Sequence, residues 1–348
     1  MTTPQVARVE AWGSDFERQT PVDVPELTEA RVTSLASGRD HILALLWNGT
    51  IKAWGNNELG QLGDGSNVGH LTPGTVRTLT GVTALAAGCD HSLALMSDGT
   101  VKAWGSNLFG ELGDGTNNNS TTPVTVTGLS GVRAIAGGCN HSLALMSDGT
   151  VKAWGNNVYG QLGDGTNNNS AIPVTVTGLA DVRTIAGGGL HSLAVLSDGS
   201  VRAWGLNNLG QLGDGTNNDS STPVVVAALR GARAIAAGGY HSLALLSDGT
   251  VKGWGSNGDG QLGNGTNNDS STPITVTGLT DVRTIAARFS HSLAVSGGFV
   301  NAWGGNAFGQ LGDGSTTASN VPITVVTGLG NITVVVAHSG GNFTLAAA

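Results

Sequence analysis

Short apolar runs alternate with polar, glycine-rich turns along the whole chain. Val132 to Ala136 alternates small and apolar residues, His141 to Met146 is a second apolar run, and Val151 to Trp154 is a third. The Asp148-Gly149 pair between the second and third runs is typical of a hairpin turn, because this dipeptide tolerates positive φ. The run from Pro123 to Val126 predicts an outer fourth strand that starts at proline. No segment has helical periodicity, so the pattern predicts an all-β chain of short strands.

Three motifs repeat with a period of about 50 residues. A Trp-Gly pair occurs at Trp12, Trp54, Trp104, Trp154, Trp204, Trp254 and Trp303. A His-Ser-Leu-Ala segment begins at His91, His141, His191, His241 and His291, with His41-Ile42 as a variant. A Gly-Gln-Leu or Gly-Glu-Leu tripeptide, followed by Gly-Asp-Gly or Gly-Asn-Gly, begins at Gly60, Gly110, Gly160, Gly210, Gly260 and Gly309. The chain contains seven of these units, and each is predicted to form four strands. This predicts a seven-bladed β-propeller of four-stranded antiparallel blades.

The two ends of the chain are predicted to share one blade. The chain begins with the third strand of a blade and ends with a first and a second strand, and a gapless alignment places Val336 on Ala86 and Leu345 on Leu95. Pairing of the N- and C-terminal strands would hide two sheet edges. We therefore predict a single domain over 1–348, in which one blade shares 1–30 with 331–348. The further repeats are expected at about 31–80, 81–130, 131–180, 181–230, 231–280 and 281–330.

The composition removes several classes of protein. Glycine supplies 56 of 348 residues without a Gly-X-Y period, and charged residues are only 11%, which excludes collagen and coiled coils. The formal net charge is −8 and the chain has no Lys/Arg run, so we expect no nucleic-acid partner. No apolar stretch approaches the length of a membrane span, and no signal peptide is visible. We expect a monomer in the cytoplasm, or a secreted one if a leader has been removed.

The repeated segments resemble those of the regulator of chromosome condensation family. They read Gly-Gly-x-His-Ser-Leu-Ala-Leu, Asp-Gly-Thr-Val-Lys-Ala-Trp-Gly and Asn-Asn-x-x-Gly-Gln-Leu-Gly-Asp-Gly. The resemblance covers all seven units and implies a seven-bladed propeller. Founding members exchange nucleotide on a small nuclear GTPase and bind chromatin, whereas the acidic balance of this chain disfavours chromatin. Similar bacterial propellers inhibit β-lactamases and hold their partner through aromatic residues of the Gly-x-x-His loops, where this chain has Tyr240 and Phe289.

Connections alternate between the two faces of an antiparallel blade. The Gly-x-x-His and Asn-x-x-Gly-Gln-Leu loops should therefore share one face, called the top face, and the Asp-Gly hairpins should share the bottom face. The top loops vary between units, as expected of a binding surface on a rigid scaffold. Five units have glycine three residues before the histidine, which we expect to permit positive φ, where two others have Arg288 and His338. The predicted binding residues are Arg39, Asp40, Tyr240, Arg288, Phe289, His338, Phe109, Tyr159 and Phe308.

These features predict a non-enzymatic binding propeller that recognises a protein or peptide through its top face. The alternative is an isomerase- or cyclase-type enzyme that acts on a small molecule at the top mouth of the central channel. Its candidate catalytic residues are His338, Cys89, Cys139, Asp40 and Asp90. The two cysteines occupy equivalent positions in neighbouring units. They are either small residues tolerated in a loop or a disulfide, which needs Cα atoms within about 7 Å.

The repeated histidines do not predict a metal site. The predicted symmetry spreads them around a ring, so equivalent atoms cannot converge on one ion. A hydrogen bond at the start of a strand is their expected role. The stretch from Asp214 to Ser220 resembles a calcium loop but lacks its bidentate glutamate, so we expect a turn with Asx hydrogen bonds. No cofactor motif occurs, and we predict neither a metal nor a cofactor.

Overall fold

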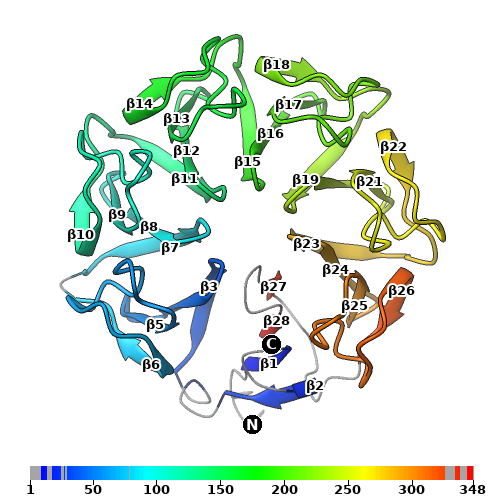
Figure 1. Cartoon of the computed structure of the whole chain (residues 1–348), viewed down its shortest axis with the longest axis horizontal. Coiled ribbons are helices and arrows are strands. Elements are labelled where there is room, and N and C mark those ends of the chain that lie inside the picture. Colours follow the sequence, from blue (N-terminus) through cyan, green and yellow to red (C-terminus); the bar gives the residue numbers. More distant parts are fainter. Residues whose placement is uncertain are drawn as a thin grey trace, which may run out of the picture.

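The computed structural model describes residues 9–13, 18–24, 27, 30–77, 79–325, 334–337 and 343–347. Every element within these residues is a β-strand, and four-stranded sheets stand around a central opening (Figure 1). Six sheets take four consecutive strands each, and one further sheet combines strands from both ends of the chain. Neighbouring strands within each sheet are antiparallel. The predicted all-β propeller of four-stranded antiparallel blades is confirmed.

The strands of each sheet are ordered from the central opening outwards (Figure 1). The innermost strands are β3 (Val32–Ser37), β7 (Val82–Ala87), β11 (Val132–Gly137), β15 (Val182–Gly187), β19 (Ala232–Ala237), β23 (Val282–Arg288) and β27 (Val334–Ala337). The second strands are β4 (His41–Leu46), β8 (His91–Met96), β12 (His141–Met146), β16 (His191–Leu196), β20 (His241–Leu246), β24 (His291–Ser296) and β28 (Phe343–Ala347).

The outer half of each sheet holds the remaining two strands. The third strands are β5 (Ile51–Gly55), β9 (Val101–Gly105), β13 (Val151–Gly155), β17 (Val201–Gly205), β21 (Val251–Gly255), β25 (Phe299–Gly304) and β1 (Val9–Gly13). The edge strands are β6 (His70–Thr75), β10 (Ser120–Thr125), β14 (Ser170–Thr175), β18 (Ser220–Val225), β22 (Ser270–Thr275), β26 (Ser319–Thr324) and β2 (Arg18–Asp23).

The edge strands begin earlier than the sequence predicts. β10 starts at Ser120, three residues before Pro123, so proline lies inside the strand and not at its start. The register between β10 and β9 shifts between Ser120 and Val124, which places Pro123 in the irregular part of an edge strand. Proline is tolerated there because its missing N–H removes no regular ladder hydrogen bond.

One sheet joins the two ends of the chain in the order β2-β1-β28-β27. Trp12 of β1 lies opposite Thr344 of β28, as Trp104 lies opposite Ser92 in a regular sheet. The predicted pairing of N- and C-terminal strands is therefore present, and Thr344 takes the position of the repeated serine.

The gapless alignment of this terminal sheet is wrong. Val336 pairs with Leu345, nine positions later, whereas Ala86 pairs with Leu93, only seven positions later. Leu345 therefore corresponds to Leu93 and not to Leu95. The connection between β27 and β28 is two residues longer than in the repeats, which a gapless alignment cannot accommodate.

The hydrophobic core lies between neighbouring sheets. Leu143 and Leu145 of β12 pack with Ala194 of β16 and Trp204 of β17, in the next sheet around the ring. The fully buried Trp204 donates its indole N–H to the backbone carbonyl of Gln161 in the preceding sheet, at 2.9 Å. A buried indole N–H needs such an acceptor. The equivalent bond joins neighbouring sheets at Trp12, Trp104, Trp154, Trp254 and Trp303.

The repeated histidine makes a second link between sheets. Nε2 of His141 lies 2.9 Å from Oγ of Ser192 in the next sheet, and that hydroxyl donates to the Gln161 carbonyl. Because the hydroxyl donates to the carbonyl, it accepts from the histidine, so Nε2 carries the ring proton. The same contact occurs at His41–Ser92, His91–Ser142, His191–Ser242 and His241–Ser292. His291 faces Thr344 at 3.4 Å.

Burial keeps these rings neutral. It lowers the pKa of His141 to about 3, because an imidazolium would lose its hydration inside the core. The structural role predicted for the histidines is confirmed. Among the described residues, no group of three or more His, Cys, Asp or Glu side chains is placed to hold a metal ion. The described part of the chain also contains no helix that could span a membrane.

Candidate functional site

The two predicted kinds of top loop do lie on one face. The backbone N–H of Asn156 donates to the carbonyl of Asn140 at 2.8 Å, which joins a loop after β13 to the loop before β12. The loops nearest the axis are joined to each other as well. Their backbone hydrogen bonds run from Arg39 to Cys89, from Cys89 to Cys139, from Gly189 to Gly238 and from Gly239 to Phe289. Variable side chains are thus held on a ring of bonded backbone.

The glycine three residues before each histidine has a different purpose from the one predicted. Gly88, Gly138 and their equivalents are absent from the glycines with positive φ. A Cβ atom on Gly138 would lie 2.0 Å from Cε1 of His141, far inside contact distance. The glycine is required because the histidine ring packs directly against its backbone, and the expectation of positive φ is wrong.

The loop between β23 and β24 solves this steric problem differently. β23 is seven residues long, and its last residue, Arg288, pairs with His291. The chain then turns through Phe289, whose φ is 41°. A bulky residue in this left-handed region is strained by about 1–3 kcal/mol, and such strain often marks a functional position. The sequence singled out Arg288 and Phe289, and the structure explains how they fit.

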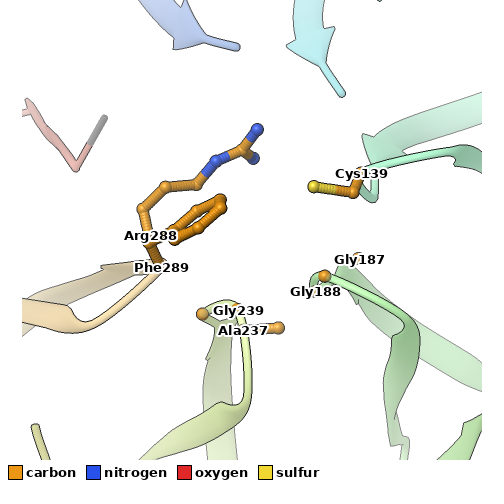
Figure 2. Close-up of a pocket in the computed structure, with 9 residues that line it drawn as sticks. Cys139, Gly187, Gly188, Ala237, Gly239, Arg288 and Phe289 are labelled. Carbon is orange, nitrogen blue, oxygen red and sulfur yellow. The ribbon is translucent and has the colours of Figure 1, made fainter. Parts of the chain in front are cut away.

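Arg288 reaches across the top mouth of the channel. Its Nη2 donates to the backbone carbonyl of Gly88 at 3.0 Å, on a sheet 200 positions earlier in the chain. Figure 2 shows Arg288 and Phe289 projecting into the central opening, with Cys139 facing them. Burial lowers the pKa of Arg288 to about 10, partly offset by Asp90, so the guanidinium stays charged at neutral pH. Below it lies a channel cavity of about 280 Å³, lined by small and aliphatic residues.

Cys89 and Cys139 form a disulfide between neighbouring sheets, with Cα atoms 4.4 Å apart. Of the two alternatives left open by the sequence, the structure has the disulfide. Neither sulfur is a free thiol there, so neither can act as a thiolate nucleophile. The bond instead fixes the rim next to Gly88, the residue whose carbonyl holds Arg288.

A cavity of about 180 Å³ opens on the top face beside Arg288. Two aromatic side chains line it, Tyr240 and Phe289, which are 42% and 40% exposed. The other lining residues are Arg39, Cys139, Asn140, Gly189, Leu190 and Gly239. We call this set the top pocket. It combines an exposed apolar wall with a guanidinium group, a chemistry that suits a protein side chain with a neighbouring polar group.

Two carboxyl groups lie next to the top pocket. A nitrogen of Arg39 is 3.6 Å from a carboxylate oxygen of Asp90. Burial nonetheless raises the pKa of Asp90, and the attraction of Arg39 and Arg288 only opposes this. Burial and the charge of Asp90 together raise the pKa of Asp40. Partial burial without full compensation is the physical cause in both cases.

The remaining predicted site residues do not meet in the top pocket. Phe109, Tyr159 and Phe308 belong to the loops between third and edge strands, and none of them lines it. Phe308 is 51% exposed. His338 lies outside the described residues. Sequence reasoning did not select Asn140 and Leu190, although they occupy the same repeat position as Tyr240, which was the signal that could have found them.

The fold and this site define a β-propeller whose variable loops surround the mouth of its channel. The chain belongs to the RCC1-like family. The family model of the RCC1-like domain matches residues 8–230. The model of the regulator of chromosome condensation (RCC1) repeat matches 232–261, 248–295 and 298–347. The expected family is thereby confirmed.

Solved structures of similar proteins agree with this. Yeast RCC1 (Prp20), in a complex with Kap60, is 27% identical with a TM-score of 0.88, covering 99% of this chain and 89% of that one. Human WBSCR16 is 24% identical with a TM-score of 0.89, covering 98% of both chains, and shows the fold alone.

Curated relatives match over much shorter segments. The ultraviolet-B receptor UVR8 of Arabidopsis thaliana is 33% identical over 69 residues, which is 20% of this chain and 16% of that protein. The RCC2 homolog of Danio rerio is 38% identical over 66 residues, which is 19% of this chain and 13% of that protein.

Proposed function

We propose that this protein is a non-enzymatic interaction propeller that binds a protein or peptide through the top pocket. The observation that carries the proposal is Phe289, a strained aromatic residue that stays 40% exposed beside Tyr240. The backbone at Phe289 disfavours a bulky residue, and the side chains of Phe289 and Tyr240 are both exposed. This arrangement benefits neither folding nor solubility. Aromatic residues and arginine are also the side chains that most often dominate binding energy at interfaces.

Similar propellers support a protein partner. One structure of yeast RCC1 (Prp20) is a complex with Kap60, and another is described with its binding to Gsp1p and histones. The acidic charge of the present chain still argues against a nucleic-acid partner. From these yeast structures the proposal takes only the way of binding, in which a rigid propeller presents loops to another protein. It does not take the identity of the partners.

Partner capture tests the proposal directly. The protein is immobilised, exposed to lysate and culture medium from its source, and the captured proteins are identified by mass spectrometry. Tyr240→Ala should remove the captured partner while leaving the melting temperature nearly unchanged, because Tyr240 is 42% exposed. Phe308→Ala is the matched control, since it removes an exposed aromatic side chain that does not line the top pocket. Equal capture by wild type and Tyr240→Ala would refute the proposal.

The alternative, an isomerase- or cyclase-type enzyme, rests on Asp40 and Asp90. Their pKa values are raised and they lie beside the same mouth, which is a known feature of acid–base sites. Asp90→Asn separates the two functions. Loss of turnover of a captured small molecule, with partner capture intact, would favour the enzyme over the interaction propeller.

A further inference from the structure

The bottom mouth of the channel carries a cluster of positive charge. Four adjacent innermost strands, β11, β15, β19 and β23, have arginine as their second residue, near the end opposite the top face. β3 and β7 have threonine at this position. All four arginines are exposed. We call these four residues the arginine arc: Arg133, Arg183, Arg233 and Arg283.

A β-bulge directs each of these side chains. The pairing of β11 with β12 shifts register between Val132 and Ala134, which leaves Arg133 unpaired in the bulge. The same shift occurs in β15, β19 and β23. Bulges bend a strand and re-aim the extra side chain. Every arginine of the arc is therefore the extra residue of a bulge at the bottom end of its strand, and Arg233 also donates its Nε–H to the carbonyl of Leu246 in its own sheet, at 3.3 Å.

Two of the arginine side chains reach from one sheet to the next. A guanidinium nitrogen of Arg133 donates to the backbone carbonyl of Val182, at the start of the neighbouring innermost strand. Arg233 donates in the same way to Val282, at 2.6 Å. These two guanidinium groups thus lie between neighbouring innermost strands, and a guanidinium has further N–H donors beyond the one used here.

The arginine arc forms no ion pair within the described residues, although Asp181 and Asp281 lie two residues before Arg183 and Arg283. The ion pairs found there are Arg39–Asp90 and His70–Asp64, and no carboxylate lies within 4.0 Å of the arc. The bottom hairpins carry exposed aspartates, but these are engaged within their own hairpins. At Asp98, hydrogen bonds from Thr100 lower the pKa of the carboxyl group, and the charge of Lys102 lowers it further. Asp148, Asp198 and Asp248 are held in the same way by their own hairpins.

We propose that the arginine arc binds an acidic peptide segment of a partner protein. The planar guanidinium fork matches a carboxylate with two parallel hydrogen bonds, and four such groups on one rim can engage successive acidic residues. The aspartates on the same face repel a wide polyanion, such as a nucleic-acid duplex, whereas a narrow extended chain can reach the axis between them. This surface is opposite the top pocket, so the proposal is independent of the proposed function.

Fluorescence anisotropy with a fluorescein-labelled decaglutamate peptide tests this site on the full chain. The main variant replaces all four arginines by threonine, which two innermost strands already carry. There, the Thr33 and Thr83 hydroxyls donate to the carbonyls of Leu45 and Leu95 at 3.1 and 3.2 Å. Wild type should bind the peptide at low salt, and the variant should bind at least about tenfold more weakly. Binding should fade as salt rises.

The matched control removes four positive charges elsewhere. Lys52, Lys102, Lys152 and Lys252 lie on third strands, where their ammonium groups donate to threonine hydroxyls of the edge strands. Their replacement by threonine changes the net charge equally and should leave decaglutamate binding nearly unchanged.

Three outcomes would overturn the proposal. They are no binding of decaglutamate to wild type, an equal loss in the arginine and lysine variants, and equally tight binding of a single-stranded oligonucleotide. If the fourfold arginine variant does not fold, Arg183→Gln with Arg233→Gln is measured against Lys102→Gln with Lys152→Gln under the same criteria.

Discussion

The junctions between sheets and the loops above them come from the same repeat, but they tolerate change very differently. At successive junctions the histidine-to-serine distance is 2.9, 2.9, 2.9 and 2.8 Å, from His91 to His241. Directly above, one loop has Gly238 and the next has Arg288 with a strained Phe289. A buried polar group without its partner costs about 1–3 kcal/mol, so one partner of a junction cannot change alone. An exposed loop pays no such penalty and is free to acquire a binding role.

The junction at the terminal sheet shows how far a departure can go when both partners change together. Ile42 stands where the other second strands have serine or threonine, and it packs with Val9 and Ala11 of β1. In register terms Phe343 lies opposite Gly13, as His91 lies opposite Gly105. Replacing both partners of a buried hydrogen bond by apolar residues is nearly neutral, whereas replacing one is costly.

Acidification should have the largest effect on stability, because it acts on the histidines that are repeated at the junctions between sheets. The buried histidines have pKa values of about 3 to 4 in the folded protein, against 6.5 in the unfolded chain. Below about pH 6.5 the unfolded chain binds protons that the buried histidines of the folded protein do not. The free energy of unfolding is therefore highest above that pH and falls with acid by about 1.4 kcal/mol per histidine per pH unit. Circular dichroism should show cooperative unfolding between about pH 6 and pH 4.

A single-site variant checks the cause of acid unfolding. His191→Gln keeps an N–H donor near Ser242 but does not titrate, so its stability should fall less steeply with acid than that of wild type. An unchanged slope, or a fold that persists below pH 4, would show that histidine protonation is not responsible.

Reduction of the disulfide should have an intermediate effect. Cys89 and Cys139 are 50 positions apart, and cross-linking a loop of that length stabilises a fold by about 4 kcal/mol in the chain-entropy model. A reducing agent should lower the free energy of unfolding in urea by up to about that amount. The Cys89→Ser, Cys139→Ser double variant should match reduced wild type and should not respond to the reagent. Two titratable thiols in the unreduced, denatured protein would contradict the pairing.

The repeat pattern predicted the positions of the strands, which depend on local alternation of apolar and polar residues. It did not predict contacts that depend on how strands and sheets pack in three dimensions. The apolar runs and Asp-Gly pairs are enough to place strands such as β12 and β13. Glycine is required at Gly138 because the ring of His141 packs against it. The two residues are close in sequence, but the position of the ring depends on how the start of β12 packs. The bond from Arg288 to Gly88 joins sheets 200 positions apart, which no local pattern can reveal. The break in the repeat at Tyr240 and Phe289 pointed to residues that line one cavity, and their role in binding stays a prediction.

We infer that Phe289 is retained for binding at a cost to folding, and a single variant tests both the binding and the cost. Phe289→Gly removes a side chain from a position with φ of 41° and should raise the free energy of unfolding by about 1 kcal/mol. The same variant should lose the partner captured by wild type. The measurement is therefore the melting temperature and partner capture of Phe289→Gly beside wild type. We expect a higher melting temperature together with lost capture, whereas an equal or lower melting temperature with full capture would show that Phe289 is neither strained nor needed for binding.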